Sequence, residues 1–181
     1  MRLAAEWLVL AWRLPSGPST PRVTVWRSLR KLGAGVLTPG AAILPYREDL
    51  HEQLDWLSEE IEDQGGDAWV LPVTELSDAE RRRVVEELQR ERTQEYEELR
   101  NEALGFLART SEGLVSGDDY SRRLRTENEL LALQRRFRKI RVRDFFNAPG
   151  RRETASTIDQ CLAFRQGISS KLTAVTDSQG S

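Results

Sequence analysis

The sequence of 181 residues predicts an α+β fold, with a small mixed domain first and a helical region after it. Two observations lead to this prediction. The first 75 residues alternate short apolar runs with amphipathic segments, in the order strand, helix, strand, strand, helix, strand. Residues 76–176 instead repeat apolar residues at helical spacing. Charge is also uneven along the chain, and this bears on the choice of partner.

The N-terminal elements follow from local signals. Trp7–Arg13 is an apolar run that is typical of a buried strand. A helix begins at Thr20 and Pro21 and is capped by Gly33, and a Pro39-Gly40 turn joins two short strands. We expect strands over 7–13, 34–37, 41–44 and 68–73, and helices over 20–32 and 47–63.

This order is the split βαβ arrangement, so residues 1–75 are predicted to form a ferredoxin-like domain. Right-handed crossovers place the first strand in the centre of the sheet, in agreement with its apolar sequence.

The helical region, residues 76–176, is expected to contain helices over about 77–109, 119–146 and 152–173, before a disordered tail at 177–181. Ser77 and Glu80 form a capping box at its start. Two of the helices carry apolar residues at the same spacing of i, i+3, i+7 and i+10, and should pack as an antiparallel hairpin. These residues are Tyr96, Leu99, Ala103 and Phe106 in the first helix and Leu130, Leu133, Phe137 and Ile140 in the second.

The stretch Arg122–Phe146 raises the main functional question. Residues 120–152 carry 11 basic and 3 acidic side chains, whereas residues 51–119 carry 7 basic and 20 acidic ones. A glutamate stripe over 87–102 can pair with the arginines of 135–143, as charges do at the edges of a coiled coil, and this is the interpretation we favour for most of the charge. Two alternatives are contact with nucleic-acid phosphates and recognition of an oxyanion by paired guanidinium groups.

The helix over 20–32 offers a second basic surface, for which ordinary capping and a solvated helix face are the simpler interpretation. From the two helices we select ten candidate residues for binding nucleic acid or an oxyanion. They are Arg22, Arg27, Arg30, Lys31, Arg135, Arg136, Arg138, Lys139, Arg141 and Arg143.

Catalytic signals are weak. His51 is the only histidine and lies on a surface-type helix, and Cys161 lies in an apolar helical pattern typical of a core. The sequence has no P-loop, no G-x-G-x-x-G motif and no Cys/His ligand cluster. We therefore expect no enzymatic activity, no cofactor and no metal. A single cysteine suits a reducing cytoplasm, and no apolar run approaches the roughly 20 residues of a membrane span.

Several spaced motifs resemble the N-terminal region of the ChrB family, regulators of bacterial chromate resistance. These are the strand Trp7-Leu-Val-Leu10, the run Arg22-Val-Thr-Val-Trp-Arg-Ser-Leu-Arg-Lys-Leu-Gly-Ala34, Gly40 with Leu44-Pro45, Gly66-x-Ala68, and Arg135-Arg-Phe-Arg-Lys-Ile-Arg-x-Arg-Asp-Phe-Phe146. The resemblance covers most of residues 5–172. It implies a cytoplasmic, DNA-associated regulator that responds to chromate, with DNA and chromate or another oxyanion as partners.

The resemblance also bears on assembly. Full-length ChrB proteins carry a second, C-terminal domain that this chain lacks, so we expect a stand-alone module or a separate ChrB-type partner that supplies it. The N-terminal part also resembles, more weakly, the Cas2-like domains of PaaX-type repressors. Cas2 nucleases hold a metal with an acidic residue at the end of the first strand, where this chain has Arg13-Leu-Pro15. Nuclease chemistry is therefore not expected, whereas a homodimer of such domains is.

Overall fold

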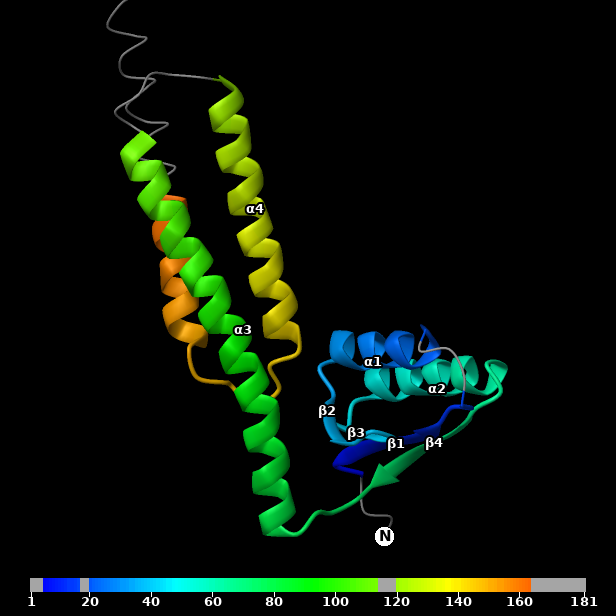
Figure 1. Ribbon diagram of the computed structural model, residues 1–181. Coiled ribbons are helices and arrows are strands. Elements are labelled where there is room, and N and C mark those ends of the chain that lie inside the picture. Colours follow the sequence, from blue (N-terminus) through cyan, green and yellow to red (C-terminus); the bar gives the residue numbers. More distant parts are fainter. Residues whose placement is uncertain (1–4, 17–19, 114–119, 164–181) are drawn as a thin grey trace, which may run out of the picture. The chain divides into compact units, whose positions relative to one another are not determined.

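A computed structural model describes residues 5–16, 20–113 and 120–163 of the chain. The described chain forms two compact units. The first contains Met1–Arg90 and Arg143–Phe146, and the second contains Glu91–Val142 and the chain from Asn147 onwards. The architecture is an antiparallel sheet with helices followed by a helical region, so the predicted α+β class is confirmed (Figure 1).

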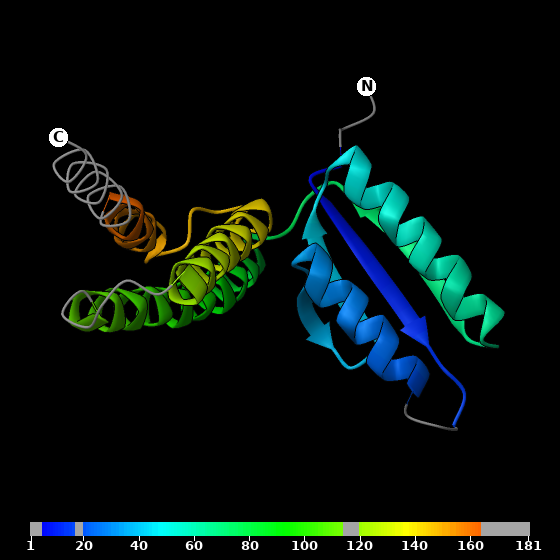
Figure 2. The same ribbon diagram turned by 90° about the horizontal axis from the view of Figure 1, so that it is seen from above.

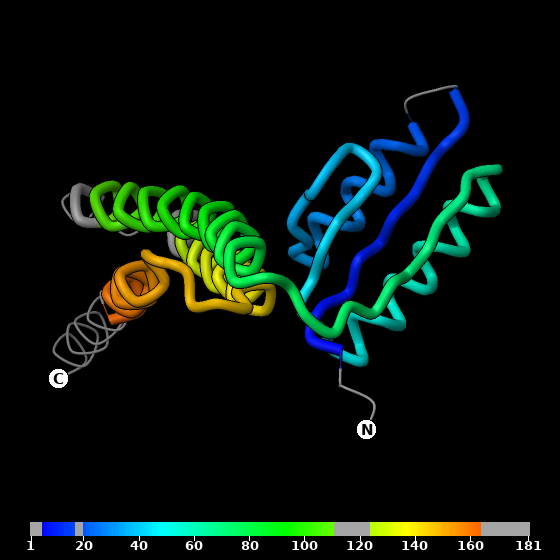
Figure 3. Tube along the Cα trace, turned by 90° about the horizontal axis from the view of Figure 1, so that it is seen from below, coloured from blue at the N-terminus to red at the C-terminus, as the bar shows by residue number. Residues whose placement is uncertain are grey.

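The first unit contains a four-stranded sheet in the order β2-β3-β1-β4. Its strands are β1 (Trp7–Arg13), β2 (Gly35–Thr38), β3 (Ala41–Pro45) and β4 (Asp67–Val73). All neighbouring strands are antiparallel, and Leu10 of β1 lies opposite Ala42 of β3 and Val70 of β4. Figure 3 shows β1 between β3 and β4, which confirms its predicted central place.

Two helices, α1 (Thr20–Leu32) and α2 (Glu48–Asp63), cover one face of this sheet (Figure 2). Val25 and Leu29 of α1 are buried with Leu8 and Leu10 of the central strand. The buried stripe of α2 consists of Leu50, Leu54, Leu57 and Ile61, which recur at helical spacing.

The helix ends follow the predicted glycine signals. Gly33 has a positive φ of 81°, its amide donates to the Arg30 carbonyl, and the Ala34 amide donates to the Leu29 carbonyl. These two bonds define a Schellman motif at the end of α1. The Gly65-Gly66 pair ends α2 with the same pattern of bonds, to Glu62 and Ile61.

The opposite face of the sheet is also covered. Trp7 and Ile43 lie in a buried cluster with Val84 and Leu88, which belong to the helix α3 (Asp78–Gly113). The ring of Phe146 stacks on Trp7 with 5.8 Å between the centroids. Residues 78–90 and 143–146 thus belong to the same compact unit as the sheet.

The capping box at the start of α3 is present. The Ser77 hydroxyl and backbone amide both donate to the Glu80 carboxylate, over 2.7 Å and 3.1 Å. The hydrogen bond from the Ser77 side chain is the main reason why the pKa of Glu80 lies below its ordinary value.

The second unit contains residues 91–113 of α3, the helix α4 (Tyr120–Val142) and a further helix over residues 151–163. α4 ends at Val142, before the expected end at 146, because residues 143–146 join the first unit. The rest of the predicted helix up to 173, and the predicted tail at 177–181, lie outside the described residues.

The predicted hairpin core is present in the second unit. Tyr96, Leu99, Ala103 and Phe106 of α3 are all buried in one cluster with Leu130, Leu133 and Ile140 of α4. Ile158 and Cys161 of the 151–163 helix complete this cluster. Cys161 is therefore a core residue, as predicted.

We expect that Gly66→Ala lowers the free energy of unfolding of the first unit by about 1–3 kcal/mol. A Cβ atom at position 66 would lie 2.5 Å from the Arg13 carbonyl oxygen and 2.8 Å from Cγ2 of Ile61. All five tryptophans lie in the first unit, so urea unfolding followed by tryptophan fluorescence reports this unit.

Gly105→Ala is the matched control. Its Cβ would meet the flexible Arg109 guanidinium at 3.3 Å, so alanine should raise stability by about 1 kcal/mol in far-UV circular dichroism. Equal effects of the two substitutions would contradict the predicted close approach at Gly66.

Candidate nucleic-acid and oxyanion interface

α1 presents a basic surface in the first unit. The helix contains no acidic residue, and its four cations Arg22, Arg27, Arg30 and Lys31 are all exposed. Arg22 donates to the Pro15 carbonyl over 3.1 Å, ahead of the helix. The Arg30 guanidinium lies over the ring of Trp26, with 4.7 Å between Cζ and the centroid.

Arg143 belongs to the same surface. Its guanidinium donates to the carbonyl of Arg30 over 3.0 Å, at the C-terminal end of α1. A cation at this position is favourable because the last carbonyl groups of a helix carry partial negative charge. α1 and Arg143 together therefore bring five of the ten candidate residues into one unit.

The other five candidates lie on α4 in the second unit. The buried stripe of Leu130, Leu133 and Ile140 directs one side of α4 into the helical core. Arg135, Arg138, Lys139 and Arg141 are exposed, and Arg136 is half-buried. The structure thus places five of the ten candidates on each of the two units.

Part of the α4 charge pairs within the helical hairpin, as the sequence predicted. Arg136 lies within salt-bridge distance of Glu98, at 3.3 Å, and also pairs with Glu102. Arg109 of α3 and Glu129 of α4 form a second pair at 3.3 Å. Glutamates of this stripe also form ion pairs within α3, where Glu91 and Glu95 pair with Arg92.

Three arginines of α4 make no ion pair or hydrogen bond with the described residues. They are Arg135, Arg138 and Arg141, spaced three residues apart along the helix. Residues three apart are neighbours on a helix surface, so Arg138 can act together with either of the others on a bound anion.

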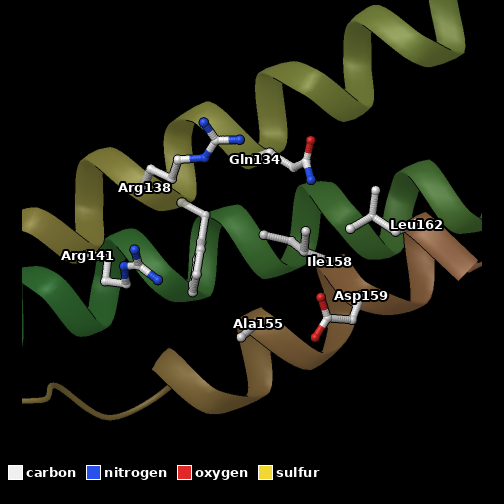
Figure 4. Close-up of a pocket in the computed structure, with 8 residues that line it drawn as sticks. Gln134, Arg138, Arg141, Ala155, Ile158, Asp159 and Leu162 are labelled. Atoms are coloured by element: carbon white, nitrogen blue, oxygen red, sulfur yellow. The ribbon is translucent and has the colours of Figure 1, made fainter.

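Arg138 and Arg141 also line a pocket of about 190 Å³ between α4 and the 151–163 helix. Figure 4 shows the two arginines on the α4 wall and Asp159 on the opposite wall. The remaining lining residues are mostly apolar and are Gln134, Phe137, Ala155, Ile158 and Leu162. The pocket therefore offers two guanidinium groups, one amide and one opposing carboxylate to a ligand.

The two residues considered for catalysis have ordinary surroundings. His51 lies 3.9 Å from Asp55, one turn along α2, and packs near the Tyr46 ring. Burial raises the pKa of the Cys161 thiol, whereas a reactive cysteine needs a lowered one. Within residues 5–16, 20–113 and 120–163, no group of three or more His, Cys, Asp or Glu side chains could hold a metal ion.

Comparison with known proteins now gives the family. A family described as "Protein ChrB, N-terminal" matches residues 22–178 of this sequence. The chain belongs to the ChrB family. This membership agrees with the resemblance that its sequence motifs showed.

One curated relative is Protein ChrB of Cupriavidus metallidurans, which is 36% identical over 72 residues. The match covers 40% of this chain and 22% of that ChrB protein, so it spans about a fifth of the relative's length. No solved structure matches the chain. In the described part of this ChrB-family chain, none of the helices is long and apolar enough to cross a membrane.

Two residues were not recognised from the sequence, a buried arginine and an exposed tryptophan. Arg92 is only 2% exposed, and its Nη1 has no hydrogen-bond partner among the described residues. Its place on the buried stripe could have been read from the spacing, because Leu88 precedes it and Tyr96 follows it by one turn. Trp26 is 47% exposed, and its position one turn before Arg30 was the available signal.

We expect an energetic coupling of about 0.5 kcal/mol between Arg136 and Glu102, which are partly exposed. The reversals Arg136→Glu and Glu102→Arg should each destabilise the helical hairpin, and the double variant should recover part of the loss. Chemical unfolding followed by circular dichroism measures this coupling.

The matched control combines Arg135→Glu with Glu102→Arg. Arg135 makes no ion pair with Glu102, so the two effects should add. Additive effects for the Arg136 pair as well would contradict the internal pairing.

Proposed function

We propose that this chain is a non-catalytic regulatory module of the ChrB type, which associates with DNA through the unpaired guanidinium groups of α4. The observation that carries the proposal is the arrangement of Arg135, Arg138 and Arg141. They remain exposed and make no ion pair with the described residues, although the neighbouring segment 51–119 carries 20 acidic residues. Such cations neutralise phosphates and release counterions without reading bases.

The surroundings of the potential catalytic groups support a role without catalysis. The thiol of Cys161 is buried and its pKa is raised, so the thiol is predominantly protonated at neutral pH. His51 pairs with Asp55 within its own helix. Neither group lines the pocket that Arg138 and Arg141 share.

The alternative function is that of a structural or docking module, in which the basic helix pairs with the acidic one. The contacts of Arg136 with Glu98 and Glu102 favour it. This pairing uses one of the α4 candidates, however, and leaves the three arginines above for an external partner.

A gel-shift titration on duplex DNA from upstream of the gene tests DNA association. The triple variant Arg135→Ala, Arg138→Ala, Arg141→Ala should weaken binding at low salt by at least about tenfold. The slope of log K against log salt should fall by about 2.7, since each phosphate contact contributes about 0.9.

A charge-matched control removes Arg82, Arg83 and Arg90 of α3, which are exposed beside acidic residues. This control should leave the shift nearly unchanged. Absence of any shift by the unaltered protein at low salt would overturn the DNA association, and equal losses in both triple variants would overturn the role of α4.

Oxyanion sensing is a second candidate, favoured by the pocket that Arg138 and Arg141 share. A tetrahedral dianion such as chromate suits two adjacent guanidinium groups, which donate bidentate hydrogen bonds that lysine cannot reproduce. Asp159 on the opposite wall would repel the same dianion.

Calorimetric titration with chromate should therefore respond to two variants in opposite directions. The double variant Arg138→Lys, Arg141→Lys keeps the charge but should lower affinity about tenfold, the effect of losing about 1.4 kcal/mol. Asp159→Asn should raise affinity by up to about fivefold, the effect of removing one exposed charge interaction. Affinity that is unchanged in both variants would exclude this pocket as the chromate site.

A further inference from the structure

The two helices that cover the sheet of the first unit carry opposite charges. α1 carries four basic residues and no acidic one, whereas α2 carries eight acidic residues and no Lys or Arg. Figures 1 and 2 show the two helices side by side on the same face of the sheet. Between these two helices, the basic side chains therefore lie only on α1, in a strip about 20 Å long for 13 residues.

Trp26 lies within this strip. Its side chain is 47% exposed although indole rings are usually buried, and the Arg30 guanidinium lies 4.7 Å from its ring centroid. The Arg143 guanidinium donates to the Arg30 carbonyl, which adds a further cation at this end of α1. An exposed indole beside an arginine forms a flat, cationic platform in a helix that is otherwise basic.

We infer that α1 binds single-stranded nucleic acid, with a base stacked on the Trp26–Arg30 platform and phosphates contacted by Arg22, Arg27 and Lys31. Aromatic and guanidinium groups stack on any base, but only where the base is not already stacked within a duplex. This inference rests on the proposed association with nucleic acid. It differs from that proposal because α1 would bind a single strand, whereas α4 would bind duplex DNA.

The acidic residues of α2 argue against a membrane surface as the partner of α1. A flat anionic membrane that reached α1 would also meet the carboxylates of α2, because both helices cover the same face of the sheet. A single strand is thin enough to follow α1 alone. Charge complementarity along one helix, together with an exposed stacking group, therefore favours a flexible polyanion that carries bases.

The experiment measures the anisotropy of a labelled oligothymidylate of about 12 nucleotides, within the usual range of single-strand site sizes. Trp26→Ala should weaken binding about tenfold, and Trp26→Phe should retain most of the affinity because a smaller ring still stacks. Trp56→Ala is the matched control, since Trp56 is 61% exposed but lies on the acidic α2. Circular dichroism confirms that each variant is folded.

Each outcome decides the inference. A loss confined to Trp26→Ala supports it, even if the duplex gel shift proposed for α4 fails. Equal affinities of the Trp26→Ala and unaltered proteins, or equal losses in the Trp26→Ala and Trp56→Ala variants, overturn it while leaving the duplex result intact. Vesicles of phosphatidylglycerol form a further arm, and tighter Trp26-dependent binding to them than to the oligonucleotide would assign α1 to a lipid surface instead.

Discussion

β1 is buried on both of its faces, so the first unit has to supply a layer of cover on each side of the sheet. Leu8 and Leu10 face the helices α1 and α2, while Trp7 faces Val84, Leu88 and Phe146. A strand with two buried faces reads as a continuous apolar run, which explains why Trp7–Arg13 was identified at its exact bounds. The second layer of cover comes from two distant parts of the chain, the start of α3 and the segment after α4. The packing of the sheet therefore determines where both of these helices can begin or end.

The ion pairs between α3 and α4 in the second unit also follow from the packing of apolar residues. The apolar stripes of α3 and α4 bring Glu98 and Glu102 within reach of Arg136, so internal pairing is a consequence of core packing. Partly exposed pairs of this kind contribute little stability. Their larger effect is to distinguish Arg136, which pairs within the hairpin, from Arg135, Arg138 and Arg141, which make no ion pair with the described residues. The proposals for α4 depend on this difference between its arginines rather than on the total positive charge of the helix.

The sequence was sufficient for the order of the strands, the glycine at the end of α1, the capping box and the apolar stripes of α3 and α4, because each depends on local chemistry or regular spacing. It was insufficient where residues that fit a helical pattern pack in the other unit, and where a charged residue is buried. Phe145 and Phe146 extend the helical pattern of α4, but they pack in the first unit, so the helix stops at Val142. Arg92 shows the converse case, because a charged residue occupies a buried position on the apolar stripe of α3. The division of the basic candidates between two units also needed the fold, since spacing along a helix does not show which unit covers it.

The return of residues 143–146 to the first unit gives the chain a discontinuous domain. Gln89 of α3 donates to the Phe146 carbonyl and Arg143 donates to the Arg30 carbonyl of α1, so specific bonds join these residues to both helices. A gene fragment that ended before them would encode a sheet whose Trp7 had lost its stacking partner. In sequence terms, residues 91–142 are therefore an insertion within the first unit, which is complete only when the chain continues to Phe146.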